Sequence, residues 1–393
     1  MKAWPGLLLS LLLAACATPP EPRADERFFN DTGFAPPSER IRAEDVFALS
    51  PAMQQYLDHE IADKLRSRGR QQGLIDALYA KGELRLEYDS TMTRNAAQAF
   101  EARTGNCLSL VLMTAAFAKA LGLPVYYQSV FTDETWSRSG DIHFVIDHIN
   151  LSLGKKLTDV SRTARYQEVL TVDFLPPQGA GQQRVRILPE NTVVAMYMNN
   201  RAAESLARGR LNDAYWWSRE AVLQDPALAR AYNTLGVVYR RSGDLAQAES
   251  VLRQALLQEP SNPQVVANLA QVLSDQGRVA EAGMLQQRLA QLESEPPFLY
   301  FDRGQVALRN GDYAAARDLF AREVARAPYY HEFHYWLAVA YLKLDDLKQA
   351  RKHLALAMES STTRGDHDLY AAKLDRIRAY QAHPPAGLPL PGG

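Results

Sequence analysis

Hydrophobic and small residues in the second half of the chain recur with a period of 34 residues. The period is marked by glycines, by alanines five residues later and by prolines, at Gly209, Gly243, Gly277 and Gly311, at Ala214, Ala248, Ala282, Ala316 and Ala350, and at Pro226, Pro260 and Pro328. Within one unit, Tyr232, Leu235 and Tyr239 have the spacing of one helix face. The pattern therefore predicts repeated helical hairpins, in which Gly permits the turn and Ala permits two helices to approach closely.

A unit of this length with Gly, Ala and Pro in these places resembles the tetratricopeptide repeat. We expect about five units over residues 195–364, then a capping helix and a flexible tail over 365–393. Two positions depart from the pattern. Asp345 replaces the turn glycine of the fifth unit and Glu323 stands where Ala is usual, so we expect looser packing in those units. The proline expected near Ser294 is displaced to Pro296 and Pro297.

Arrays of such repeats bind other chains on a concave surface lined by the first helix of each unit. Polar side chains that suit a peptide backbone or a carboxylate, and that would lie on this surface, are Asn199, Asn200, Arg230, Asn233, Arg240 and Arg241. The alternative is that these side chains form an ordinary solvated face. His331 and His334 have the one-turn spacing of a metal-binding pair. Their aromatic surroundings are more typical of repeat core, so we expect no metal site.

The middle of the chain contains a helix that is apolar on every side. Lys119 is the only charged residue in 108–121, and Gly122 provides a stop. Cys107 falls in the first turn of this predicted helix. Unpaired backbone N–H groups and the positive end of the helix dipole favour a thiolate there, so the sequence indicates an activated nucleophile.

A thiolate nucleophile needs a base and a group that orients the base. Residues 141–149 alternate between apolar and polar, which predicts a strand, and a second strand is expected around Asp159. His143 and His148 then point to opposite faces, so only one can face Cys107. If His143 and Asp159 are cross-strand neighbours, the three side chains form a Cys-His-Asp triad.

This segment resembles the transglutaminase-like superfamily, which is related to papain-fold cysteine enzymes. The resemblance is carried by an Arg-x-Gly-x-Cys entry, an Ala-Leu-Gly-Leu-Pro exit and the His-to-Asp interval, at Arg103, Gly105, Cys107, 120–124, His143 and Asp159. It implies an α+β domain over residues 40–190 in which Cys107 is the nucleophile, His143 the general base and then acid, and Asp159 the orienting group. The backbone N–H of Cys107 is the one oxyanion donor that we can name.

The N-terminus begins with an apolar run over 7–15, shorter than the ~20 residues of a membrane-spanning helix. The tetrapeptide that ends at Cys16 resembles the lipobox of bacterial lipoproteins. The resemblance implies a signal peptide over 1–15 and a lipid on Cys16, with the protein in the cell envelope, at the outer membrane facing the periplasm. The alternative is an ordinary secretory signal. Prolines in residues 16–39 predict an extended tether.

Composition narrows the choice of partner and cofactor. The 44 Lys and Arg nearly cancel the 45 Asp and Glu to give a net charge of −1, so no strong field attracts nucleic acid. The chain has only two cysteines, Cys16 and Cys107, which excludes an intrachain disulfide framework and a four-thiolate zinc site. We see no acidic calcium loop and expect no cofactor.

Together these patterns predict a membrane-anchored cysteine enzyme that transfers the acyl group of an amide bond, by peptide hydrolysis, deamidation or transamidation. The repeats would recruit a protein or peptide. The alternative is a catalytically inactive envelope scaffold that binds its partners through the repeats.

Overall fold

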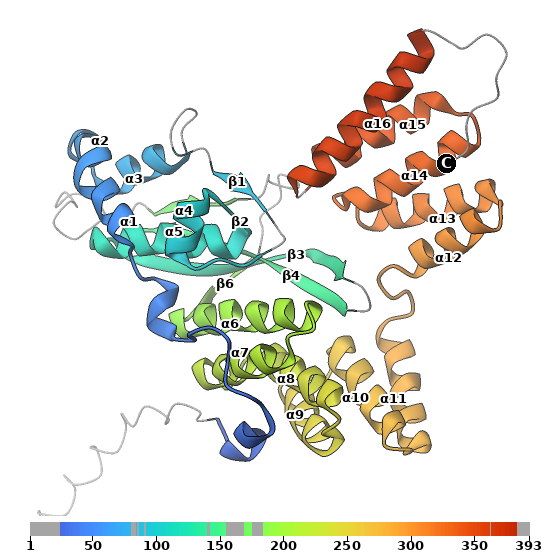
Figure 1. The fold of residues 1–393 in the computed structure, drawn as a ribbon, viewed down its shortest axis with the longest axis horizontal. Coiled ribbons are helices and arrows are strands. Elements are labelled where there is room, and N and C mark those ends of the chain that lie inside the picture. Colours follow the sequence, from blue (N-terminus) through green and yellow to red (C-terminus); the bar gives the residue numbers. More distant parts are fainter. Residues whose placement is uncertain are drawn as a thin grey trace, which may run out of the picture.

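The structure is a computed structural model that describes residues 24–79, 84, 86–89, 92–139, 142–154, 169–174, 184–361 and 363–382. Within these ranges, side chains are not described at 87, 131–148, 184 and 380–382. A mixed region of helices and strands comes first and is followed by an array of helical hairpins (Figure 1).

The mixed region contains short helices and one larger sheet. The helices are α1 (Pro51–Gln55), the π-helix η4 (Tyr56–Glu60), α2 (Ala62–Arg68), α3 (Arg70–Tyr79), α4 (Ala96–Ala102) and α5 (Cys107–Ala120). The strands are β1 (Glu87–Tyr88), β2 (Thr104–Gly105), β3 (Val125–Ser139), β4 (Ile142–Leu153), β5 (Leu170–Val172) and β6 (Arg184–Leu188). The described strands form a four-stranded sheet in the order β5-β4-β3-β6 with antiparallel neighbours, and a parallel pair of β1 and β2.

Helix α5 is the centre of the mixed region. Every residue from Cys107 to Ala118 is buried, which agrees with the helix predicted from its uniformly apolar sequence. The helix packs against β4, where Ile149, Leu151 and Leu153 are at most 1% exposed. This burial holds the first turn of α5 in one place relative to the sheet.

The array consists of paired helices, with the turns where the sequence predicts them. The described hairpins are α6 (Glu190–Ala207) with α7 (Leu211–Gln224), α8 (Ala229–Ser242) with α9 (Leu245–Gln258), α10 (Pro263–Asp275) with α11 (Val279–Leu292), α12 (Leu299–Arg309) with α13 (Tyr313–Arg326), and α14 (His331–Lys343) with α15 (Leu347–Glu359). Helix α16 (Arg364–Ala382) packs on α15. The turn residue Gly243 has φ +87°, a conformation that favours glycine, and Asp345 adopts φ +60° in the equivalent turn.

The array is interrupted between α11 and α12, which lie apart on either side of an extended link (Figure 1). The link contains Pro296 and Pro297 and ends at Phe298, whose φ is +65°. One buried core joins α6–α11 to the mixed region, and a separate core begins at Phe298. The displaced prolines therefore mark the point where the array divides into two halves.

Glu323 caps a neighbouring helix, a role that the repeat pattern does not predict. It is 2% exposed, and its Oε1 accepts hydrogen bonds from the backbone N–H groups of Tyr300 at 2.8 Å and Phe301 at 3.3 Å. These are first-turn donors of α12, whose preceding residue makes no side-chain cap. The looser packing expected at Glu323 is thus replaced by a buried carboxylate that caps a neighbouring helix.

The N-terminal strap, which we define as residues 24–46, lies along the first two hairpins. Phe34 stacks on Tyr215 with ring centroids 4.0 Å apart, and Phe28 meets Tyr232 edge-on at 5.5 Å. The Tyr239 hydroxyl donates to the carbonyl of Phe28 at 2.8 Å. The part of the predicted tether that the structure describes is therefore packed on the repeats from residue 24 onward. In the described parts of the chain, no helix has both the length and the apolar character needed to cross a membrane.

Candidate functional site

Cys107 is the first residue of α5 and is 4% exposed. The residue before it, Asn106, is the N-cap: its side-chain Oδ1 accepts the backbone N–H of Ser109 at 2.9 Å. Asparagine is among the best N-capping residues because its oxygen satisfies a donor that the helix leaves unpaired. The sulfur therefore belongs to a well-formed helix N-terminus, where the helix dipole favours negative charge.

The residues just before the cysteine explain the spacing of the Arg-x-Gly-x-Cys motif. Arg103 ends α4 in the left-handed region with φ +53°. Gly105 pairs with Tyr88 across the parallel strands β1 and β2. A side chain at Gly105 would place its Cβ 2.6 Å from the Cβ of Ser109, so glycine lets β2 run close beside the first turn of α5.

Tyr88 is a site residue that the sequence did not indicate. Burial raises the pKa of Tyr88 and negative charge on Cys107 adds to this shift, whereas a hydrogen bond from the backbone N–H of Cys107 to the phenol oxygen opposes it. The phenol therefore stays neutral and occupies the donor that the sequence offered for an oxyanion. Nothing in the local sequence could reveal this contact, because it depends on the pairing of β1 with β2.

The other two members of the predicted triad are His143 and Asp159. His143 lies on β4, and its main chain is opposite Arg138 of β3. Its side chain and the whole of Asp159 lie outside what the structure describes, as does Cys16. In the described part of the sheet, the strands beside β4 are β3 and β5. The strand expected around Asp159 stays a prediction.

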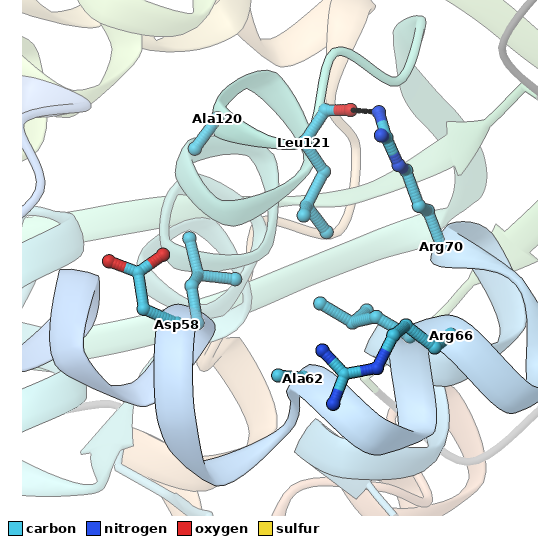
Figure 2. A pocket seen from close by; sticks show the side chains of 8 residues that line it. Asp58, Ala62, Arg66, Arg70, Ala120 and Leu121 are labelled. Carbon is cyan, nitrogen blue, oxygen red and sulfur yellow. Dashed lines mark hydrogen bonds between the residues drawn. The ribbon is translucent and has the colours of Figure 1, made fainter.

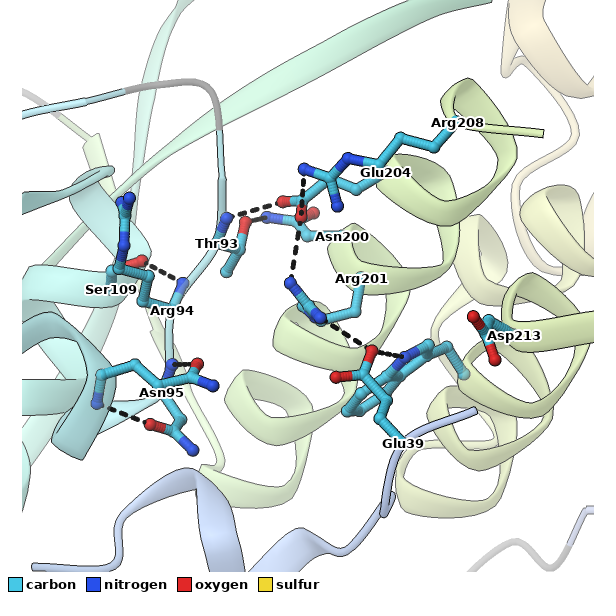
Figure 3. A network of polar contacts seen from close by, with 12 residues as sticks. Glu39, Thr93, Arg94, Asn95, Ser109, Asn200, Arg201, Glu204, Arg208 and Asp213 are labelled. Atoms are coloured by element: carbon cyan, nitrogen blue, oxygen red, sulfur yellow. Dashed lines mark hydrogen bonds and ion pairs between the residues drawn. The ribbon is translucent and has the colours of Figure 1, made fainter. Parts of the chain in front are cut away.

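A polar network connects the start of α5 to the array (Figure 3). Thr93 contacts Asn106 on one side, and Asn200 and Glu204 of α6 on the other. Burial raises the pKa of Glu204, although hydrogen bonds from Thr93 and the charge of Arg201 oppose this shift. The guanidinium of Arg201 also bonds to Glu39 of the strap, at 2.8 Å. The strap, the array and the mixed region are thus connected through one largely buried polar network.

The structure gives most of the predicted partner-binding residues intramolecular bonds. Asn200 donates to Thr93 at 3.3 Å, Arg240 to Asp275 at 2.6 Å and Arg241 to the carbonyl of Leu206 at 3.2 Å.

The remaining three predicted binding residues differ in their surroundings. Asn233 accepts a bond from Asn268 at 2.9 Å, and Arg230 is half-buried. Asn199 is 8% exposed, and its Oδ1 is buried without a hydrogen-bond partner. The bonds of Asn233, Arg240 and Arg241 join neighbouring hairpins and that of Asn200 joins the array to the mixed region, so a partner that uses these residues must compete with the bonds.

His334 and His353 of the fifth hairpin form a neutral hydrogen-bonded pair, and the two histidines of the predicted pair, His331 and His334, bond to different partners. His334 Nε2 lies 2.9 Å from the carbonyl of Pro328 and must carry a proton, so its Nδ1 accepts from Nδ1 of His353 at 3.0 Å. His331 bonds instead to Tyr370 at 2.8 Å. Among the described residues, no group of three or more His, Cys, Asp or Glu is arranged to hold a metal.

This pair predicts a pH-dependent stability for the second half of the array. Burial lowers the pKa of His334, and burial together with His334 lowers that of His353 to about 4. The unfolded chain, with imidazole pKa values of ~6.5, therefore takes up protons first as the pH falls. Stability should be nearly complete above about pH 7.5 and decrease by roughly 2–3 kcal/mol towards pH 4, because each pH unit between the unfolded and the folded pKa contributes about 1.4 kcal/mol.

Thermal unfolding of the full chain, followed by circular dichroism between pH 7.5 and 4.5, measures this effect. His353→Gln should reduce the dependence on pH, and His59→Gln at an exposed site should leave it unchanged. An equal loss of stability in the wild type and in His353→Gln would contradict the assignment.

A surface hollow of about 340 Å³ lies at the opposite end of α5 (Figure 2). It is lined by Leu57, Leu65, Ala120 and Leu121, with Arg66 among the charged residues around it. Thirteen residues of helix, or roughly 20 Å, separate Ala120 from Cys107. The hollow is therefore not a substrate pocket for the thiol.

Comparison with known proteins identifies the array. One tetratricopeptide-repeat family model matches residues 239–292 and another matches residues 301–362. No curated protein matches the chain. Similar solved structures include YrrB, described as a TPR protein with an unusual peptide-binding site, at 23% identity over 46% of this chain and 92% of that one, with a TM-score of 0.25.

Two further solved structures are similar over about the same share of the chain. PilF of Pseudomonas aeruginosa is 21% identical over 48% of this chain and 96% of its own, with a TM-score of 0.27. A thermophilic TPR protein of Thermus thermophilus is 18% identical over 46% and 98%, with a TM-score of 0.28. The family models and the hairpin geometry together identify residues 190–361 as a tetratricopeptide-repeat array, an all-helical solenoid of the kind that binds protein or peptide partners.

Proposed function

We propose that the mixed region is a transglutaminase-like domain that performs acyl transfer through Cys107, with His143 as base and Asp159 as the group that orients it. The observation that carries the proposal is the position of Cys107 as the first residue of a buried, asparagine-capped helix. Burial alone would disfavour a thiolate, whereas the helix N-terminus and a histidine partner favour it. A cysteine placed in this way suits a nucleophile better than a core residue.

In the proposed reaction, His143 takes the proton of the Cys107 thiol and the sulfur attacks the carbonyl carbon of an amide. The oxyanion that forms accepts the backbone N–H of Cys107, so the Tyr88 phenol must first leave that donor. The carbon–nitrogen bond then breaks, His143 gives its proton to the departing amine, and a thioester remains. Water or a second amine attacks the thioester and releases the thiol.

We assign the remaining parts of the chain to delivery and location. The repeat array recruits the protein or peptide that carries the amide, or a partner that controls access to it. Cys16 carries the lipid that holds the protein at the outer membrane, facing the periplasm. The apolar run before Cys16 and its lipobox-like tetrapeptide support this location.

The pH dependence of Cys107 alkylation tests the nucleophile. With iodoacetamide, we expect a reactivity midpoint at least one pH unit below the ~8.5 of an ordinary thiol, because the helix N-terminus and His143 stabilise the thiolate. His143→Ala should raise the midpoint, and His59→Ala at an exposed site should not. A midpoint near 8.5 in the wild type, unchanged in His143→Ala, would contradict the proposal.

A second function, a non-catalytic envelope scaffold, is favoured by one observation. Cys107 is almost fully buried, and Tyr88 holds its backbone N–H, as expected of a site that no substrate enters. Complementation of a deletion strain separates the two functions. If Cys107→Ser restores the wild-type phenotype to the deletion strain and the repeat-disrupting Gly236→Ala does not, the protein acts as a scaffold.

A further inference from the structure

Thr93 lies at the centre of the buried network in Figure 3 and is 1% exposed. Its hydroxyl oxygen accepts hydrogen bonds from Nδ2 of Asn106 at 2.8 Å and from Nδ2 of Asn200 at 3.3 Å. Its backbone N–H donates to Oε1 of Glu204 at 2.6 Å. Since Asn200 and Glu204 both belong to α6, the first helix of the array holds Thr93 by its main chain and by its side chain.

Asn106 connects this contact to the thiol. Its Oδ1 accepts both the backbone N–H of Ser109, at 2.9 Å, and the Ser109 hydroxyl, at 2.8 Å. Oδ1 and Nδ2 are parts of one planar amide, so the bond from Nδ2 to Thr93 fixes the direction in which Oδ1 points. Without that bond the amide can rotate, and the first turn of α5, which starts with Cys107, loses its cap.

The Ser109 hydroxyl is itself held by the segment that carries Thr93. It accepts the backbone N–H of Arg94 at 2.8 Å, so Thr93 and the residue after it contact both groups that shape the first turn. On its other side, Ser109 lies against Gly105, so closely that a methyl group on Gly105 would collide with it. The turn is therefore confined from two directions.

We propose that Thr93 is a positioning residue for Cys107, and that Asn200 and Glu204 of the repeat array hold it in place. The inference rests on the proposed function, because it assumes that the ionisation of Cys107 matters. It assigns the first hairpin a role in the site in addition to partner binding. A partner that displaces α6 would thereby change the reactivity of the thiol.

Thr93→Val tests the proposal, because valine keeps the shape of threonine and removes the oxygen. In the full chain, we expect iodoacetamide to alkylate Cys107 about fivefold more slowly at pH 7, with a higher pH midpoint, since the cap and its field are weakened. Thr93→Ser, which keeps the hydroxyl, should restore both values. The matched control is Thr192→Val, which removes a buried hydroxyl that bonds to Asp225 at 2.6 Å.

Each outcome separates this inference from the proposed function. A low wild-type midpoint that rises in Thr93→Val but not in Thr192→Val supports the inference. A low midpoint that neither variant changes, or that both raise equally, overturns the inference and leaves the nucleophile intact. An ordinary wild-type midpoint overturns the proposed function. If urea unfolding shows that Thr93→Val does not fold, Asn200→Ala decides: an unchanged midpoint there overturns the inference.

Discussion

Gly236→Ala is expected to destabilise the first half of the array by about 3 kcal/mol, measured by urea unfolding of the full chain. A Cβ at this position would lie 2.5 Å from Cγ of Leu252 and 2.8 Å from its Cδ2. Leu252 is completely buried, so it cannot move aside without shifting α9 relative to α8. The same contact recurs in the second half, where a Cβ at Gly304 would lie 2.6 Å from the ring of Phe320.

Gly283→Ala is the matched control for this prediction. Gly283 is also within a helix of the array, yet a Cβ there would meet nothing within 4 Å. Alanine should therefore increase stability by roughly 0.5–1 kcal/mol, because glycine is the poorer helix former. Equal effects of the two substitutions would show that the close approach of α8 and α9 does not determine stability.

Glu323→Ala is expected to destabilise the second half of the array by about 2 kcal/mol, although alanine is the residue that the repeat favours. Equivalent positions in other hairpins hold Ala221, Ala255 and Ala357, all completely buried. At Glu323 the carboxylate instead accepts two backbone N–H groups from α12. Its removal leaves two buried donors without a partner at the point where the array restarts.

The comparison with Glu323→Gln identifies the cause. Glutamine keeps an oxygen that can accept the same bonds, so the loss should be below about 1 kcal/mol. Urea unfolding of both variants gives the two values. An alanine variant as stable as the wild type would show that the repeat pattern, and not the cap of α12, decides the residue at this position.

The repeated hairpins could be predicted from the sequence because their contacts are local. Gly243 and Ala248 are close in the chain, and the turn and the helix contact that they permit involve neighbouring segments. Asp345 in a turn of positive φ follows from the same period. The sequence shows that Glu323 stands where the repeat usually has Ala. The reason for the glutamate lies at the start of the preceding helix, α12, and could not be inferred from the period.

The site was predictable only in part, for a similar reason. The apolar run after Cys107 predicted the buried helix, and the alternating pattern around His143 predicted the strand β4. Tyr88 reaches Cys107 through strand pairing, and Thr93 bonds to Asn106, the residue before Cys107, while the array holds it. No spacing in the sequence records such contacts, because they are set by how separate elements pack.

The N-terminal strap shows the same limit. Its prolines predicted an extended tether, whereas the described part of that tether contains two short 3-10 helices, Glu26–Phe28 and Asp31–Gly33, and the prolines say nothing about what the segment contacts. Phe28 and Phe34 become buried because tyrosines of the first two hairpins are positioned to receive them. Their burial places the start of the described chain on the array.

The most direct test of the acyl-transfer account is mass spectrometry of the full chain after brief reaction with p-nitrophenyl acetate and an acid quench. The account predicts a burst of p-nitrophenol and one acetyl group on the peptide that contains Cys107, absent in Cys107→Ser and strongly reduced in His143→Ala. Acetylation of Cys107 only after the chain is unfolded, with no burst from the native protein, would contradict it.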